Sequence, residues 1–584
     1  MGRKKRDLKD DFIVSGFLFH MSQIYIYQFA LILLVSALFF ALKVGITPIL
    51  LPICFIGSAI LLYIFYDREI GICFLLEIVA AFIILMLAII FSGIIYDNTW
   101  DGNTYHKLGV GMMRYGWNPL YELPEGEVAA RIIRTDQLFD ISLWTEAYTK
   151  GTETFGAAVY AITGNIECGK AYTLLVMFCG FSVTCYILRK IGKTRVMSLL
   201  FSIAVAIHPL AVQQIDSFYV DGFLHIMVVG MIFSLVMYMD PTNVFDRKIA
   251  WSMVLGTVII CSNVKFTGLL FSACFCFANF LYKSVCNWKK AQKEQILKDM
   301  LMFGCIAMIA VFWAGSTSYV TNLIRHKTIG YPLTGKDPVS FESSISPFAG
   351  KNHVSNLLVS IYSEMDNFNY ASGREPELKL PMTYRSTPER DALFRAVDIV
   401  LSGFGPYFSA VFTIALISIA FWVCTNKFKE NLIIFVNLFT CIVLCAMISE
   451  SWLAKYSPHV YIIALIGFYL VLDSLKQPAR AMAGGIITAI YLVNSLVFLK
   501  YIPEEIVQSK EIKCTIAGMS EYDRVVFDYT DIGAYPGICF NLIDEEVDYR
   551  VDLGLNEAGQ GTRLHELYPY FYMTSWMPEQ DDKK

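Results

Sequence analysis

Residues 71–106 read GICFLLEIVAAFIILMLAIIFSGIIYDNTWDGNTYH. The first part, 71–95, carries a single charge, Glu77, and is long enough to cross the ~30 Å hydrocarbon core of a bilayer. At Tyr96 the sequence turns abruptly polar, as expected where a membrane helix reaches water. The stretch therefore predicts a membrane helix whose end presents Asp, Tyr and His side chains at the membrane surface.

Similar apolar runs recur along the chain of 584 residues, which is 56% hydrophobic and 17% charged. Soluble domains have roughly 25% charged residues. We therefore expect an all-α polytopic membrane protein with about 13 transmembrane helices, at 24–42, 48–65, 71–95, 171–188, 196–210, 221–239, 249–262, 266–282, 300–319, 397–424, 431–448, 458–473 and 481–499. The shorter run 152–164 predicts a re-entrant or interfacial piece. The net charge of -4 is spread out, which argues against nucleic acid as a partner.

Lys and Arg are distributed unequally between the two sides of this arrangement. The N-terminus and the alternate connections hold 21 of them, whereas the short loops on the other side hold only Lys43, Lys265 and Lys455. Because cytoplasmic segments are enriched in Lys and Arg, the N-terminus is predicted to be cytoplasmic and the C-terminus extracytoplasmic. The expected location is the cell (inner) membrane, with multiple crossings and contacts to membrane lipids.

All large polar segments then lie outside. A transmembrane domain, 1–499, carries the outer loops 96–170 and 320–396, and the tail 500–584 forms a small extracytoplasmic domain. We expect this domain to be α/β, because VVFDYTD, GICFNLI and DYRVDLGL are typical of short strands. Cys514 and Cys539 lie in the tail, either as a disulfide or as two free thiols.

The first outer loop holds the first candidate catalytic residues, Asp97 and Asp101, followed by Tyr105 and His106. A carboxylate at this position can take a proton from a hydroxyl. Each residue also has a structural alternative. Asp97 would mark the water boundary, Asp101 would cap an amphipathic helix over 105–115 on the membrane surface, and His106 would be an interfacial polar residue.

Later outer segments add charged and aromatic candidates for substrate binding: Asp221, Lys265, Arg325, Lys455 and Tyr456. Their alternatives are a helix N-terminus for Asp221, snorkelling for Lys265 and pairing with Glu450 for Lys455. Together, however, they place carboxylates and cations on one membrane face. Cations there can hold a departing phosphate while a carboxylate activates an acceptor.

Five motifs carry a family resemblance, in this order: WDGNTYH (100–106), HPLAVQQIDSFYVDG (208–222), VKFTG (264–268), HKTIGYPL (326–333) and AKYSP (454–458). The first resembles the Asp-x-x-x-Tyr-His signature in the first outer loop of bacterial GT-C glycosyltransferases. More narrowly, the set is similar to the family related to protein O-mannosyltransferases and lipid A aminoarabinose transferase. The resemblance extends from about residue 24 to 475.

The resemblance implies an enzyme that transfers a sugar, with inversion, from a polyprenyl-phosphate donor to an extracytoplasmic lipid, glycan or protein. Asp101 would act as base or bind the acceptor, and Tyr105 and His106 would line the site. Asp221 would be a second acidic residue, and Lys265 and Lys455 would approach the phosphate. Some related enzymes use a divalent cation, which stays open here because no ligand set in the sequence demands one.

The chain departs from the family in three of these motifs. In HKTIGYPL the usual Pro is missing and Ile329 precedes the Gly. Gly102 follows Asp101 where the family often has Glu, so either Asp97 or Asp101 can be the base. Lys455 stands where Arg is usual, which replaces a bidentate phosphate contact by a monodentate one.

Two rival functions predict other features. A polysaccharide polymerase or ligase would rely on a catalytic pair of cations rather than on an aspartate in the first loop. A lipid or solute transporter would bury charges in mid-helix, and the mid-helix charges of the predicted spans reduce to Glu77.

Overall fold

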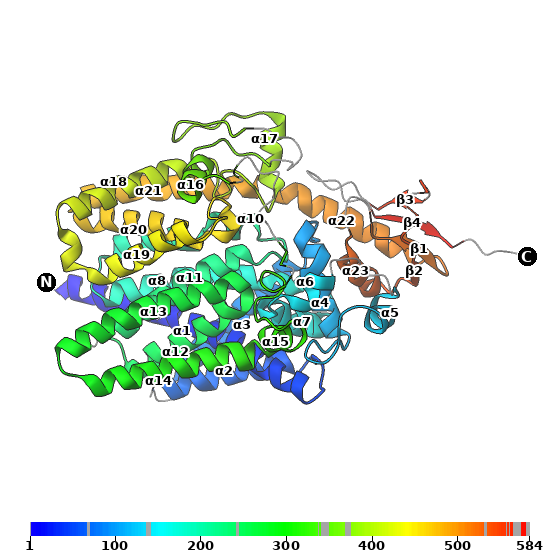
Figure 1. Cartoon of the computed structure of the whole chain (residues 1–584), viewed down its shortest axis with the longest axis horizontal. Coiled ribbons are helices and arrows are strands. Elements are labelled where there is room, and N and C mark those ends of the chain that lie inside the picture. Colours follow the sequence, from blue (N-terminus) through cyan, green and yellow to red (C-terminus); the bar gives the residue numbers. More distant parts are fainter. Residues whose placement is uncertain are drawn as a thin grey trace, which may run out of the picture.

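The computed structural model describes residues 2–66, 71–135, 142–240, 244–336, 338–339, 348, 350–367, 375–530, 534–555, 558–559, 561–564 and 574–579, with side chains from residue 14 onward except at 66, 142, 430 and 563. Most of this chain is helical, and the long helices run side by side along the longest axis of the molecule (Figure 1). They are α1 (Gly2–Ala41), α2 (Leu50–Tyr66), α3 (Ile72–Ser92), α8 (Tyr172–Lys190), α9 (Arg195–Ala206), α11 (Asp221–Met239), α12 (Arg247–Val264), α13 (Phe266–Lys289), α14 (Lys293–Met308), α18 (Phe408–Cys424), α19 (Leu432–Met447), α20 (Pro458–Ser474) and α21 (Ala479–Leu496).

Within the described residues, seven helical segments are long and apolar enough to cross a membrane, and five further apolar helices are shorter. The expectation of a helical membrane protein is confirmed at this level. Every predicted span overlaps a helix of the bundle.

Several predicted boundaries differ from the observed ones. The span predicted for 397–424 begins only at Phe408, because Gly405, with φ +103°, and Pro406 form a turn just before it. The first helix begins at Gly2 rather than at residue 24. The run 152–164 forms α7 (Gly151–Thr163), a helix whose residues are buried from Gly151 to Ala161.

One buried polar pair connects two helices of the bundle. His20 of α1 and Glu77 of α3 lie 2.6 Å apart, Nδ1 to Oε1, and both are buried. The mid-helix charge of the predicted third span thus joins two neighbouring helices.

The elements of the predicted outer segments gather at one end of the bundle. They include η1 (Gly102–His106), α4 (Lys107–Arg114), α5 (Glu127–Ile133), α6 (Ser142–Ala147), η2 (Ile166–Ala171), α10 (Pro209–Gln213), α15 (Thr321–His326), α16 (His353–Ile361) and α17 (Pro388–Ala392). Leu108 to Met113 are all buried, so the helix predicted over 105–115 exists but does not lie on a membrane surface. It packs inside the protein, against α7 on one side and Phe540 of the C-terminal region on another.

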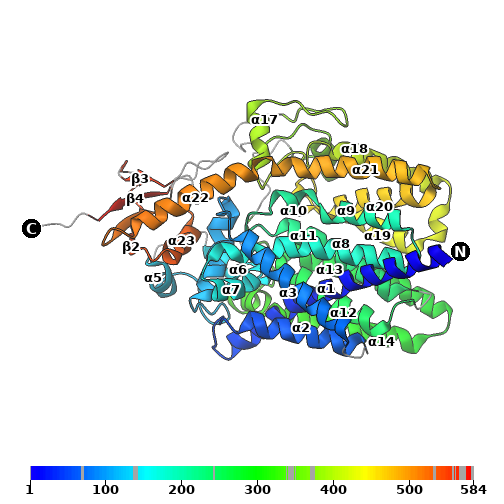
Figure 2. The same cartoon turned by 180° about the vertical axis from the view of Figure 1, so that it is seen from behind.

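The C-terminal region continues from α21 through η8 (Val497–Tyr501) into α22 (Ile502–Met519), which leads away from the bundle (Figure 2). A four-stranded sheet follows, ordered β2-β1-β4-β3. β1 (Val525–Asp528) pairs in parallel with β2 (Tyr549–Val551) and antiparallel with β4 (Ser575–Pro578), which also pairs with β3 (Thr562–Arg563).

Two details of the tail correct the sequence prediction. GICFNLI forms η9 (Pro536–Ile538) and α23 (Cys539–Asp544) instead of a strand, since a short apolar run buried on all sides has no period that separates helix from strand. Cys514 is exposed, Cys539 is buried and both are free thiols, which rules out the disulfide alternative.

Candidate functional site

Asp97 lies buried at the start of the first outer loop, and its carboxylate is fully hydrogen-bonded. It accepts from the Thr99 backbone N–H at 2.8 Å, the Thr99 hydroxyl at 2.6 Å and the Phe218 backbone N–H at 2.8 Å. These bonds fix the turn after α3 and attach it to the segment before α11. Burial raises the pKa of Asp97, while Lys170 opposes the shift.

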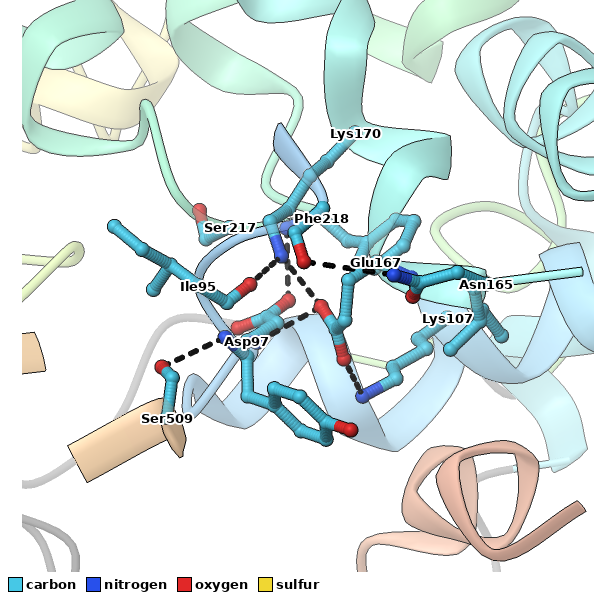
Figure 3. A network of polar contacts seen from close by, with 12 residues as sticks. Ile95, Asp97, Lys107, Asn165, Glu167, Lys170, Ser217, Phe218 and Ser509 are labelled. Atoms are coloured by element: carbon cyan, nitrogen blue, oxygen red, sulfur yellow. Dashed lines mark hydrogen bonds and ion pairs between the residues drawn. The ribbon is translucent and has the colours of Figure 1, made fainter. Parts of the chain in front are cut away.

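A buried network surrounds Asp97 (Figure 3). Glu167 accepts from the Asp97 backbone N–H at 2.9 Å and forms ion pairs with Lys107, at 2.5 Å, and with Lys170. Lys107, Glu167 and Lys170 are fully shielded from solvent. Lys107 also donates to Asn541 of α23 at 2.5 Å, so the network joins the loop after α3, η2 and the C-terminal region.

Two glycines allow close packing around the first loop. A Cβ on Gly102 would overlap the Asp97 carboxylate, which gives a physical reason why Glu does not follow Asp101 in this chain. A Cβ on Gly537 would press on the Asn103 carbonyl oxygen. The C-terminal region thereby supports the backbone of η1, the element that carries Tyr105.

Asp101 differs from Asp97 in exposure and bonding. It is partly exposed, and its side chain accepts no hydrogen bond from the residues that the structure describes. Its backbone N–H lies 3.4 Å from the Tyr219 hydroxyl, and its side chain makes no helix-capping bond. The predicted capping role is therefore wrong, and the carboxylate is available to another partner.

Lys455 lies near Asp101 in a second group of charges. Its Nζ is 2.6 Å from Oδ2 of Asp398, and Glu450, the partner predicted from the sequence, bonds instead to Ser449. Burial disfavours the ammonium charge, but Asp398, Tyr456, Asp101 and Asp221 outweigh it and raise the pKa of Lys455 well above its usual range. Lys455 therefore stays positively charged at neutral pH.

Tyr456 connects Lys455 to Lys265. The two ammonium groups lie 5.4 and 4.5 Å from the centre of its ring. Lys265 is the single extended residue between α12 and α13, and it forms an ion pair with Asp221 at the N-terminus of α11. Asp221 also accepts from Gln214 at 3.2 Å.

Tyr105 and His106 belong to an aromatic group beside these charges. Tyr105 packs against His106, Trp144 and Tyr148, with ring centres 4.4, 6.2 and 5.5 Å away. Burial, reinforced by the Asp101 carboxylate, raises the pKa of Tyr105 well above its usual range, so its hydroxyl stays protonated. His106 is buried, with Nδ1 3.2 Å from Oε1 of Glu153.

Arg325 bonds to other residues than this group. It pairs with Glu146 at 3.1 Å, and its other terminal nitrogen approaches the carbonyl oxygens of Pro119, Leu120 and Glu122 at 3.4 to 3.5 Å. His326 shares Glu146 and stacks on Tyr331. These contacts give Arg325 a structural task in joining α15 to the first outer loop.

The site also contains residues that sequence reasoning missed. Asp398 was assigned to a membrane span, and only the loop at 397–407 shows that it faces Lys455. Tyr148 and Glu153 carry no motif of their own. Glu153 could have been noticed as an acid at the start of the apolar run 152–164.

The described residues contain no group of three or more His, Cys, Asp or Glu side chains arranged to hold a metal ion. Comparison with protein families, with curated proteins and with solved structures gives no match to this chain.

Proposed function

We propose that this protein is an integral membrane glycosyltransferase that moves a sugar from a polyprenyl-phosphate donor to a hydroxyl of an extracytoplasmic lipid, glycan or protein, with inversion. The observation that carries the proposal is an open carboxylate, Asp101, close enough to Lys455 and Tyr456 to act on their charge, with Lys455 and Lys265 both beside the Tyr456 ring. Sugar transfer from a phosphate needs both charges at one site.

In this mechanism Asp101 acts as the general base. The acceptor oxygen forms a bond to the anomeric carbon as the bond from that carbon to the phosphate oxygen breaks, and the hydroxyl proton passes to the Asp101 carboxylate. The bonding electrons leave with the polyprenyl phosphate, whose growing charge Lys265 and Lys455 stabilise. Attack opposite to the leaving phosphate inverts the anomeric centre.

The hydrogen bonding favours Asp101 over Asp97 as the base. Asp97 already accepts three hydrogen bonds in a buried turn, whereas the Asp101 carboxylate is partly exposed. It positions the loop that carries Asp101. Tyr105, whose hydroxyl stays protonated, can donate to a sugar or acceptor oxygen, while His106 holds the aromatic group through Glu153.

The proposal includes an orientation. All thirteen predicted spans would cross the membrane, counting α12 and the shorter apolar helices with the seven long segments. The N-terminus would be cytoplasmic, and the outer loops and C-terminal region extracytoplasmic. Such a site lies where a lipid-linked donor presents its phosphate at the outer leaflet.

Donor binding tests the cation assignment. Native mass spectrometry of the detergent-solubilised full chain with added polyprenyl phosphate should show one bound lipid for wild type. Lys455→Gln should weaken its retention, whereas Lys500→Gln, a surface lysine outside the site, should leave it unchanged. Equal retention of polyprenyl phosphate by Lys455→Gln and wild type would refute a phosphate-binding role for Lys455.

The rival functions give different results with Asp101→Asn. A transferase loses nearly all turnover, a polymerase or ligase that relies on cations keeps it, and a transporter moves labelled substrate across proteoliposomes without chemical change.

A further inference from the structure

A second group of cations lines a cavity at the end of the bundle opposite the candidate site, where α13 turns into α14 (Figure 1). The cavity has a volume of about 890 Å³ and lies between the ends of α11 and α13 and the starts of α12, α14 and α19. Five cations line it: Arg247, Lys283, Lys290, Lys293 and Lys298. The two lining carboxylates, Asp240 and Glu294, leave the cavity with an excess of positive charge.

The carboxylates of this basic cavity are already engaged. Asp240 accepts from the Val244 and Phe245 backbone N–H groups at 2.5 and 3.2 Å, and Glu294 pairs with Lys298 at 3.0 Å. Arg247 pairs with Asp299 at 3.0 Å, so the cations that form no ion pair with a described residue are Lys283, Lys290 and Lys293.

Asn287 gives independent evidence that this cavity binds a ligand. It lines the basic cavity and is buried, yet its side-chain Nδ2 finds no acceptor among the described residues. A buried donor without an acceptor is unfavourable. Beside several cations, an anionic oxygen is the group that would satisfy it.

An apolar cleft adjoins the basic cavity. It has a volume of about 330 Å³ and lies between α9, α11, α19 and α20, with walls that include Phe201, Val229 and Ile466. Asn431 and Ile433, at the start of α19, belong to the walls of both hollows. The two hollows together offer a place for a ligand with an anionic head and an apolar tail.

We propose that the basic cavity and the apolar cleft bind one anionic phospholipid, with its phosphate headgroup among Lys290, Lys293 and Asn287 and an acyl chain in the cleft. In the proposed orientation this site faces the cytoplasmic leaflet, where anionic lipids attract basic segments. It is separate from the donor site, and it does not depend on the proposed transferase activity.

Native mass spectrometry of the full chain, titrated with phosphatidylglycerol or phosphatidylcholine, tests the site. Wild type should retain one phosphatidylglycerol at least tenfold more tightly than phosphatidylcholine. Lys290→Gln and Lys293→Gln should each weaken that binding roughly fivefold, since one basic residue near an anionic lipid contributes about that factor. Lys248→Gln and Lys289→Gln, exposed neighbours outside the cavity lining, should have no effect.

A cleft variant separates a lipid from free phosphate. Ile466→Trp, at a half-buried position of the cleft wall, should weaken phosphatidylglycerol and leave binding of inorganic phosphate unchanged. Asp101→Asn should bind phosphatidylglycerol like wild type, so this test stands even if the transferase proposal fails. Equal retention of the two lipids, equal effects of cavity and control lysines, or an Ile466→Trp variant that binds phosphatidylglycerol normally would overturn the proposal.

Discussion

Replacing Glu167 with Gln removes the carboxylate that lies between two buried lysines. Glu167 pairs with Lys107 and Lys170, and no atom of the three side chains reaches bulk water to a significant extent. Removing one partner of a buried ion pair costs roughly 3–5 kcal/mol, because the remaining charge stays desolvated without compensation. We expect Glu167→Gln to destabilise the protein by an amount in this range.

The surrounding charges allow a compensating variant. Asp97, Glu167, Lys107 and Lys170 form a set with two charges of each sign, since Asp97 interacts electrostatically with both lysines. Glu167→Gln leaves this set with an excess positive charge, whereas Glu167→Gln combined with Lys170→Met restores neutrality. The double variant should therefore be more stable than Glu167→Gln alone, although it carries one more substitution.

Thermal challenge followed by fluorescence-detected size-exclusion chromatography measures these effects in detergent. Glu294→Gln serves as the matched control, because Glu294 pairs with Lys298 at the surface, where such a pair contributes roughly 0.3–0.5 kcal/mol. The reasoning fails if Glu167→Gln and Glu294→Gln lower the melting temperature equally, or if Lys170→Met adds its own loss to that of Glu167→Gln.

Three further predictions concern the loop, the C-terminal region and the orientation. Gly102→Ala should displace the Asp97 carboxylate and lower the melting temperature. Gly230→Ala should not, because an added Cβ there would meet no atom within 4 Å. Equal melting temperatures of the two variants would contradict the packing argument. Burial raises the pKa of Asp544 to about 7, so the contribution of Asp544 to docking of the C-terminal region should be fully present below about pH 4 and be lost as pH rises through 7. Melting curves between pH 5 and 8 should show this slope in wild type and lose it in Asp544→Asn, and a slope that persists in the variant would count against it. A membrane-impermeant maleimide added to intact cells should label exposed Cys514 if the tail is extracytoplasmic. Equal labelling of a Cys514→Ser protein, or labelling only after lysis, would argue against that orientation.

Much of the architecture follows from the sequence, because hydropathy reports directly on helices of membrane length. The predicted range 221–239 coincides with α11, and each other range overlaps a helix. Helix boundaries set by turns were harder to predict. The turn at Gly405 and Pro406 makes α18 begin at Phe408, and hydropathy alone does not detect this turn. The strand predicted at GICFNLI failed for a similar reason, since a run buried on all sides lacks a diagnostic period.

The candidate site was only partly predictable. The distribution of charge predicted that Asp101, Lys265 and Lys455 share one membrane face; in the structure Lys265 and Lys455 lie beside the Tyr456 ring, and Asp101 acts on the charge of Lys455. Sequence spacing could not separate the two loop-one aspartates, because the difference lies in hydrogen bonds from Thr99 and Phe218, far apart in the chain. The ion pair between Arg325 and Glu146 was likewise not predictable, because it depends on a fold that brings α6 against α15.

An assay of polyprenyl phosphate release tests the central claim most directly. Purified protein in liposomes is given a panel of polyprenyl-phosphate sugars together with outer-envelope acceptors, and the released polyprenyl phosphate is measured. Loss of a general base slows a reaction by about 10²–10⁴-fold, so Asp101→Asn should release product at that reduced rate while keeping the wild-type melting temperature. Wild-type rates in Asp101→Asn, or no release from any donor by the wild-type protein, would contradict the account.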